Sequence, residues 1–225
     1  MKKKVALVID NDHFIRQSIP KWKEKFDLRV FNPPRSPPKI RTPLDLLRVL
    51  KNKWEIRTQL PKLAEWADIV FCEWATHYLK WLSKKNYNNI LACRMHRFEL
   101  DRHYDEIEWN NVDSVLLISE AMERRFHAKG KYKGKTFVTY DNLNFEDFPL
   151  VQREKTMQIG MLGNIEPRKG ILEFVEHFRK MKLPEIKLSI AGKAKDRAYS
   201  RKIKRYILEN NLESKITIEG YVENL

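Results

Sequence analysis

The sequence is poor in cysteine and glycine, and it has no long apolar segment. Its two cysteines, Cys72 and Cys93, lie inside apolar runs, where a free cysteine usually behaves as a small buried hydrophobe. Two such residues exclude a disulfide framework and give no metal-ligand spacing, so we expect a reduced, soluble, cytoplasmic protein without a metal site. No stretch approaches the ~18 apolar residues of a membrane span. The apolar run Val5–Ile9 is too short for a signal peptide, and Asp10 and Asp12 follow it.

Aromatic residues and positive charge are abundant. The 11 Phe, 8 Tyr and 6 Trp, with an apolar fraction of 42%, exclude a disordered chain. Lys and Arg number 44 against 30 Asp and Glu, which gives a net charge of +14 spread over both halves of the sequence. Such a surface attracts an anionic membrane, a nucleic acid or a phosphorylated substrate, and charge alone does not choose among them.

Short apolar runs alternate with stretches of helical spacing along the whole chain. Alternating strands and helices predict parallel sheets with right-handed crossovers, so we expect the α/β class with Rossmann-like, doubly wound domains. The proline-rich stretch 32–38 is interpreted as a connector, and the alternative is a mobile flap over a cleft. The predicted strands are 4–9, 28–31, 67–72, 89–95, 111–118, 135–140, 157–162, 186–191 and 216–219. The predicted helices are 15–26, 44–66 (interrupted by Pro61), 78–83, one that begins after Ser119, 171–181 and 201–210.

A polar and aromatic segment, 141–149, separates two series of these elements. It suits an interdomain linker better than a strand or a helix. We therefore predict an N-terminal domain over 1–148 and a C-terminal domain over 149–225. The second has only three strands and two helices, so we expect it to be incomplete and marginally stable alone.

The stretch Gly160–Gly170 predicts a strand, a glycine turn and the start of a helix. Such a turn brings backbone N–H groups and the positive end of a helix dipole to one place, which favours an anion. Lys169 adds a positive charge, and Arg168 adds a second beside it. We interpret this stretch as a phosphate site; the alternative is that Lys169 is only a solvated residue at a helix start.

The second half resembles the GT-B glycosyltransferases, specifically the retaining glycosyltransferase family four, also called group 1. Residues 163–170 resemble the family's glycine, arginine, hydrophobic, lysine-glycine motif, and 186–192 and 216–222 resemble its two following strands. Residues 141–148 resemble its hinge, and Ser119-Glu120 resembles its Val-Ser-Glu helix start. No single piece is specific, but the pieces occur in the family's order over most of the chain.

The sequence also departs from the family pattern. The family's phosphate-contacting arginine falls on Asn164, which has no charge, and Arg168 is the candidate substitute. Asn142 replaces the hinge glycine. The family's pair of glutamates, seven residues apart, would lie beyond residue 222, so we expect either a fragment of a longer enzyme or a truncated relative with an incomplete donor site.

The resemblance implies transfer of a sugar from a nucleotide-diphosphate sugar to an acceptor, with retention and without a separate cofactor, metal or established protein nucleophile. It implies His96 and Lys169 as catalytic residues; for His96 the alternative is a structural histidine whose ring nitrogens are satisfied within the fold. Donor-binding candidates are Gly163, Asn164, Arg168, Lys169 and Gly192, although Gly192 is equally suited to permitting a turn. The acceptor-binding candidates, which follow predicted strands, are Asp10, Asn11, Glu73 and Glu99; for each of them the alternative, which the sequence favours, is a capping or solvated role. The basic surface suits a glycan or lipid-linked acceptor and peripheral contact with an anionic membrane at its inner face.

Two other classes of function remain open. A truncated GT-B-like chain would serve as a non-catalytic module that binds a nucleotide or a partner. A nucleic-acid binder would use the charge and the tryptophans, but their spacing favours core positions over stacking platforms, so we expect no nucleic-acid partner.

Overall fold

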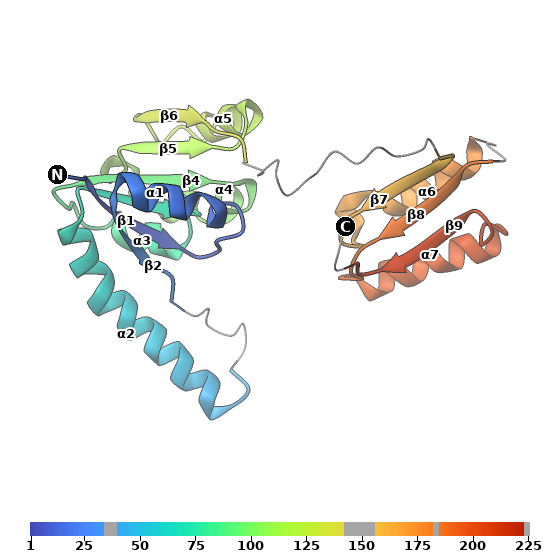
Figure 1. The fold of residues 1–225 in the computed structure, drawn as a ribbon, viewed down its shortest axis with the longest axis horizontal. Helices are drawn as coiled ribbons and strands as arrows, with labels where there is room; N and C mark the ends of the chain where they lie inside the picture. Colours follow the sequence, from blue (N-terminus) through green and yellow to red (C-terminus); the bar gives the residue numbers. More distant parts are fainter. Residues whose placement is uncertain (34–39, 142–155, 182–184, 223–225) are drawn as a thin grey trace. The chain divides into compact units, whose positions relative to one another are not determined.

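The structure is a computed structural model that describes residues 1–33, 40–141, 156–181 and 185–222. It divides into two compact units, Met1–Pro149 and Leu150–Leu225, each with its own sheet (Figure 1). The predicted boundary at 148/149 and the linker after Asp141 lie outside the described residues. Unit 1 and unit 2 are described separately below.

Unit 1 holds a six-stranded sheet in the order β2-β1-β3-β4-β5-β6, in which every neighbouring pair is parallel. The strands are β1 (Lys4–Ile9), β2 (Asp27–Phe31), β3 (Ile69–Glu73), β4 (Ile90–Met95), β5 (Ser114–Leu117) and β6 (Lys135–Val138). The helices are α1 (Ile19–Lys25), α2 (Pro43–Trp66), α3 (His77–Leu82), α4 (Arg97–Arg102) and α5 (Glu120–His127). The predicted order of strands in this half is confirmed, and so are its predicted helices, but α4 was not predicted because residues 96–99 were interpreted as a loop.

The apolar runs form central strands because both faces of the sheet are covered. Ala6 and Val8 of β1 pack in a core with residues of α2, α3, α4 and α5, whereas Leu7 and Ile9 pack on the opposite face near α1. Cys72 and Cys93 are free, and each is fully buried. The run Val5–Ile9 is therefore a strand of the sheet interior.

Helix α2 differs from its prediction because it continues through Pro61. It begins at a capping box, in which Asp45 N–H donates to Thr42 Oγ1 and Asp45 Oδ2 accepts from Thr42 N–H. Proline removes one helical hydrogen bond. Burial of Leu60 and Ala64 on either side of Pro61 holds the helix against the sheet despite that loss. The predicted interruption was wrong.

Unit 2 holds a three-stranded parallel sheet in the order β7-β8-β9. Its elements are β7 (Gln158–Leu162), α6 (Ile171–Lys180), β8 (Lys187–Ala191), α7 (Arg197–Glu209) and β9 (Ile216–Gly220). Both helices contribute to one core cluster with β8. Helix α7 begins four residues earlier than predicted because Asp196 Oδ1 accepts the Tyr199 N–H and caps it.

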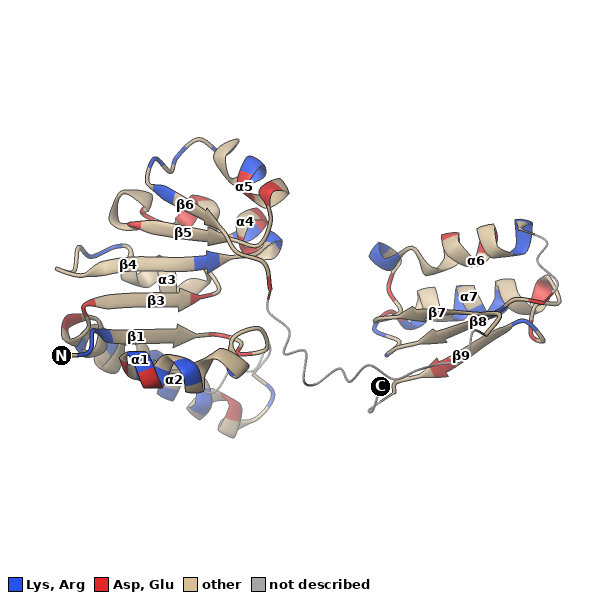
Figure 2. Cartoon of the chain, turned by 45° about the horizontal axis from the view of Figure 1, so that its top comes forward, with Lys and Arg blue, Asp and Glu red and all other residues tan. Residues whose placement is uncertain are grey.

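Positive charge occurs in both units: Figure 2 shows Lys and Arg residues along α2 and along α7. No helix among the described residues combines the length and apolar character that crossing a membrane would require.

Candidate functional site

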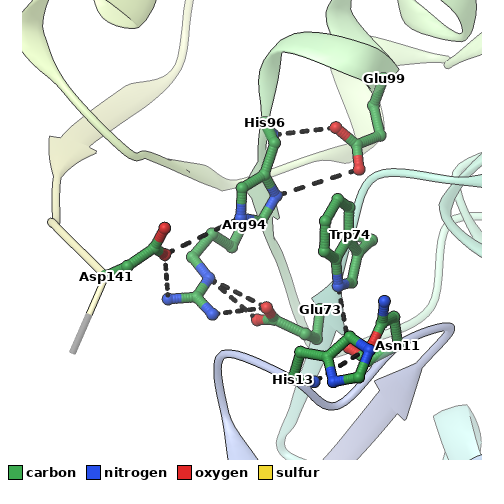
Figure 3. A network of polar contacts seen from close by, with 8 residues as sticks. All are labelled: Asn11, His13, Glu73, Trp74, Arg94, His96, Glu99 and Asp141. Carbon is green, nitrogen blue, oxygen red and sulfur yellow. Dashed lines mark hydrogen bonds and ion pairs between the residues drawn. The ribbon is translucent and has the colours of Figure 1, made fainter. Parts of the chain in front are cut away.

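A buried ion pair lies at the carboxyl end of the unit 1 sheet. Glu73 and Arg94 are register partners at the ends of β3 and β4. Arg94 Nη2 donates to Glu73 Oε1 at 2.5 Å, and Arg94 Nε donates to both carboxylate oxygens at 3.0 and 3.1 Å. The carboxylate of Asp141 lies 3.5 Å from Arg94 Nη1 (Figure 3). Arg94 therefore connects the strand ends to the start of the segment after β6.

His96 follows β4 directly and lies in an aromatic stack. The ring of Trp74 lies 4.0 Å from the imidazole at an interplanar angle of 22°, and Phe14 stacks at 5.4 Å. Trp74 Nε1 donates a hydrogen bond of 2.8 Å to the Asn11 carbonyl (Figure 3). Burial, with a further contribution from the Arg94 charge, lowers the pKa of His96 to about 4. The imidazole is consequently neutral at pH 7 and can both donate and accept a hydrogen bond.

Glu99 is fully buried on α4, beside His96. Its Oε2 accepts the backbone N–H of His96 at 3.0 Å, which caps α4, while Oε1 has no hydrogen-bond partner among the described residues. Burial raises the pKa of Glu99 to about 7. Oε1 lies 3.9 Å from His96 Nδ1, beyond hydrogen-bond distance (Figure 3). A half-protonated carboxyl with one oxygen outside any hydrogen bond among the described residues is suited to a hydrogen bond with a hydroxyl group of a ligand.

A cleft of about 1090 Å³ opens within unit 1 between α2 and the ends of β1 and β3. Its apolar wall consists of Ile40, Val49, Ile56, Trp74, Tyr78 and Phe98. Its polar residues include Asp10, Asn11, Thr76 and Glu99. Thr76 is buried, and its hydroxyl has no hydrogen-bond partner among the described residues. An apolar cleft with a few polar groups that converge on it is the usual form of a small-molecule site.

Three of the four predicted acceptor-binding residues, Asp10, Asn11 and Glu99, therefore line one cleft. Glu73 does not line it, because both of its oxygens accept from Arg94. The acceptor role of these residues stays a prediction.

Sequence reasoning did not single out Trp74, Arg94 or Asp141 as site residues. The available signal was position: Trp74 directly follows β3, and Arg94 is a lone charge in the apolar run of β4. Trp74 also has φ +77°, a left-handed conformation that a bulky side chain rarely adopts. Such backbone strain tends to occur at functional sites.

In unit 2, the loops after β7 and β8 are in close backbone contact. Gly163 N–H donates to the Ala191 carbonyl, Ile165 N–H donates to the Lys193 carbonyl, and Ile165 and Ala194 form a parallel bridge. A Cβ atom on Gly192 would lie 1.8 Å from the Gly163 carbonyl oxygen, and the φ of Gly192 is +157°. Gly192 is therefore required for the packing of these two loops. This packing explains the glycine at position 192 without any contact to a nucleotide-sugar donor.

Lys169 lies beside the first glycine loop. A Cβ atom on Gly163 would stand 3.8 Å from Lys169 Cε, and Gly163 itself has φ +147°. Lys169 is exposed, and it forms no ion pair among the described residues. Arg168 differs, because its Nη2 lies 2.7 Å from Glu166 Oε1. The structure thus brings Gly163, Lys169 and the neighbouring Asn164 together and holds Arg168 against a carboxylate.

The start of helix α6 differs in detail from the predicted strand, turn and helix. Pro167–Lys169 form a 3-10 turn, Gly170 has φ +64°, and α6 starts at Ile171. The Leu172 N–H, in the first turn of α6, donates to the Tyr199 hydroxyl at 2.9 Å. One of the free N–H groups expected at this terminus is therefore already engaged. The anion-binding role of Lys169 stays a prediction.

No group of three or more His, Cys, Asp or Glu residues is placed to hold a metal ion within the described ranges. The predicted absence of a metal stays a prediction.

Residues 144–225 match the family model described as "Glycosyl transferases group 1". A comparison with the curated proteins finds no match.

Solved structures with the same fold cover nearly the whole chain. HepE of Anabaena in complex with UDP aligns with a TM-score of 0.67 and 13% identity, over 99% of this chain and 70% of its own. The apo lipopolysaccharide outer core galactosyltransferase WaaB aligns with a TM-score of 0.66 and 19% identity, over 98% of this chain and 68% of its own. A glycosyltransferase from Rickettsia africae aligns with a TM-score of 0.62 and 17% identity, over 100% of this chain and 70% of its own. The chain thus has the fold of the GT-B glycosyltransferases, and its residues 144–225 match the group 1 glycosyl transferase family.

Proposed function

We propose that this chain transfers a sugar from a nucleotide-diphosphate sugar to an acceptor, with retention of configuration and with no cofactor beyond the donor. The observation that carries the proposal is the family match over 144–225, the region in which Lys169 lies beside the glycine loop at Gly163. The complexes of HepE with UDP and with UDP-glucose support a nucleotide-sugar donor.

On the donor side, negative charge develops on the diphosphate as it leaves, so stabilising it is mainly electrostatic. Lys169 supplies that charge, and Gly163 leaves the backbone open to a phosphate. Asn164 contributes hydrogen bonds without charge, and Arg168 contributes once its contact with Glu166 is exchanged for phosphate.

On the acceptor side, the neutral His96 hydrogen-bonds a sugar hydroxyl, and Asp10, Asn11 and Glu99 bind the acceptor in the unit 1 cleft. Glu73 holds Arg94 in place rather than contacting a sugar. No carboxylate is assigned as a nucleophile.

The donor site is tested by titrating the full chain with UDP, GDP and ADP in a calorimeter. Lys169→Ala should weaken binding of the preferred nucleotide by about tenfold, the effect of losing one charge-assisted contact. Lys180→Ala, an exposed lysine at the other end of α6, is the matched control and should change little. Equal affinity in the wild type and Lys169→Ala would refute the role of Lys169. Nucleotide binding without donor hydrolysis or transfer would favour the non-catalytic binding module.

We also propose peripheral contact with an anionic membrane through helix α2. Five large apolar side chains on its N-terminal half are 46–61% exposed: Leu44, Leu46, Leu47, Leu50 and Trp54. Basic side chains such as Arg48 lie on the same helix. An exposed apolar face with neighbouring basic residues is typical of helices that lie at a membrane surface.

Co-sedimentation with vesicles tests this contact. The wild type should be enriched on vesicles that contain phosphatidylglycerol over vesicles of phosphatidylcholine alone, and Leu47→Ser with Trp54→Ser should lose that enrichment. Equal recovery on both vesicle types would remove the proposal.

A further inference from the structure

A second, smaller hollow of about 290 Å³ adjoins the unit 1 cleft. The two share Lys53, Ile56 and His77, so they form one continuous surface between α2 and α3. The remaining residues of the second hollow are Arg57, Lys80, Trp81 and Lys84. Most of the lining of both hollows is apolar, and the smaller one is also bordered by four basic residues, Lys53, Arg57, Lys80 and Lys84.

The charges of the smaller hollow are largely uncompensated. Lys80 pairs with Glu106. Lys53, Arg57 and Lys84 are exposed, and the described residues supply no carboxylate partner to any of them. Three cations around one hollow repel one another, and an anion bound there would reduce this repulsion by neutralising part of their charge.

The larger cleft supplies complementary chemistry. Its wall includes Trp74, Phe98 and Ile56, and a volume of about 1090 Å³ is enough for a ligand of drug size. Thr76 Oγ1 and Glu99 Oε1 accept no hydrogen bond from the part of the chain that the structure describes, and both residues line this cleft. Because a buried polar atom without a partner costs free energy, these two oxygens indicate where a ligand hydroxyl is bound.

We infer that this paired cleft binds an anionic amphiphile: an acceptor that carries a hydroxyl group, an apolar chain and a phosphate-type anion. The hydroxyl lies at Thr76 and Glu99, the chain lies against Trp74 and Ile56, and the anion lies among Lys53, Arg57 and Lys84. The inference rests on the proposed function only in taking this ligand to be the sugar acceptor.

The test is calorimetric titration of the full chain with three probes: dodecyl phosphate, the uncharged dodecyl maltoside and inorganic phosphate, the two amphiphiles below their critical micelle concentrations. Dodecyl phosphate should bind saturably and about tenfold more tightly than dodecyl maltoside, because only dodecyl phosphate carries an anion for Lys53, Arg57 and Lys84. Inorganic phosphate should not saturate. Equal affinity for the two amphiphiles would overturn the anion site, and saturable binding of inorganic phosphate alone would overturn the amphiphile.

Two charge reversals on helix α2 separate the site from general attraction. Arg57→Glu should weaken the binding of dodecyl phosphate by about tenfold and leave the affinity for dodecyl maltoside unchanged. Lys62→Glu alters the net charge equally on the same helix but lies outside both hollows, so it should have little effect. The same loss in both variants would overturn the inference. These titrations measure binding to unit 1, so they give a result even if no nucleotide sugar is bound or transferred. A failure of this inference can therefore be distinguished from a failure of the proposed function.

Discussion

The indole of Trp74 lies nearly parallel to the imidazole of His96, with ring centroids 4.0 Å apart. Trp74 holds this position with a left-handed backbone, a conformation that costs about 1–3 kcal/mol for a residue with a side chain. The hydrogen bond from its indole N–H to the Asn11 carbonyl connects the ends of β1 and β3. Trp74 therefore covers one face of the His96 ring.

Removing this ring should change the titration of His96. In Trp74→Ala, solvent reaches the imidazole, so we expect the pKa of His96 to rise from about 4 toward its ordinary value. An NMR titration of the imidazole resonances measures the shift. Trp54→Ala, which truncates an exposed tryptophan on α2, is the control and should leave the pKa of His96 unchanged. The same low pKa in Trp74→Ala would show that the stack does not protect His96.

The Glu73–Arg94 pair should be costly to break from one side. In Glu73→Gln, the buried guanidinium loses its nearest counter-charge, and we expect the free energy of unfolding to fall by about 3–5 kcal/mol. The double variant Glu73→Gln with Arg94→Met should lose less than the sum of the single changes. The exposed pair Arg97–Asp101 is the comparison, and Arg97→Met should cost less than about 1 kcal/mol.

Urea unfolding followed by tryptophan fluorescence measures these changes in unit 1 alone. All six tryptophans belong to this unit: Trp22, Trp54, Trp66, Trp74, Trp81 and Trp109. Additive losses for Glu73 and Arg94 would contradict a coupled pair.

Glu99 and His96 should give opposite dependences of stability on pH. The pKa of Glu99 is about 7 in the fold against 4.5 ordinarily, so between these values unfolding releases a proton and stability falls as pH rises. The pKa of His96 is about 4 against 6.5, so there unfolding takes up a proton and stability rises with pH. Each slope is at most about 1.4 kcal/mol per pH unit, and between pH 4.5 and 6.5 the two largely cancel.

Single variants should expose each slope. Glu99→Gln should become more stable from pH 4 to 6.5, and His96→Gln should become less stable from pH 4.5 to 7, in urea unfolding across a pH series. The wild type should vary least of the three. Parallel profiles for the two variants would rule out this pair as the source.

Two glycine substitutions test the packing of unit 2. Gly192→Ala places a Cβ atom on the Gly163 carbonyl and should destabilise the unit by several kcal/mol, here about 3 or more, because backbone must shift. Gly160→Ala meets nothing within 4 Å and should be close to neutral. Hydrogen exchange of β7 and β8 measures the difference, and equal protection in both variants would contradict the close contact of the two loops.

The sequence by itself determined the order of the strands and of every α-helix except α4, since apolar runs of strand length and helical apolar spacing are local properties of the chain. Helix α4 has six residues, too few to show that spacing. It also placed Asp10, Asn11 and Glu99 after strands, and parallel strands bring such residues to one edge of a sheet. It did not predict that α2 continues through Pro61, because the contacts that hold the helix come from residues distant in sequence.

Only the tertiary structure decided which polar side chains are already paired with another residue of the protein. Glu73 and Glu99 look alike in sequence, since each follows or ends a strand. Glu73 accepts hydrogen bonds from Arg94, whereas Oε1 of Glu99 accepts none among the described residues. Likewise, Arg168 is held by Glu166 whereas Lys169 lies beside Gly163. Pairing depends on distances of a few ångströms between segments that only the fold brings together, and no local pattern records those distances.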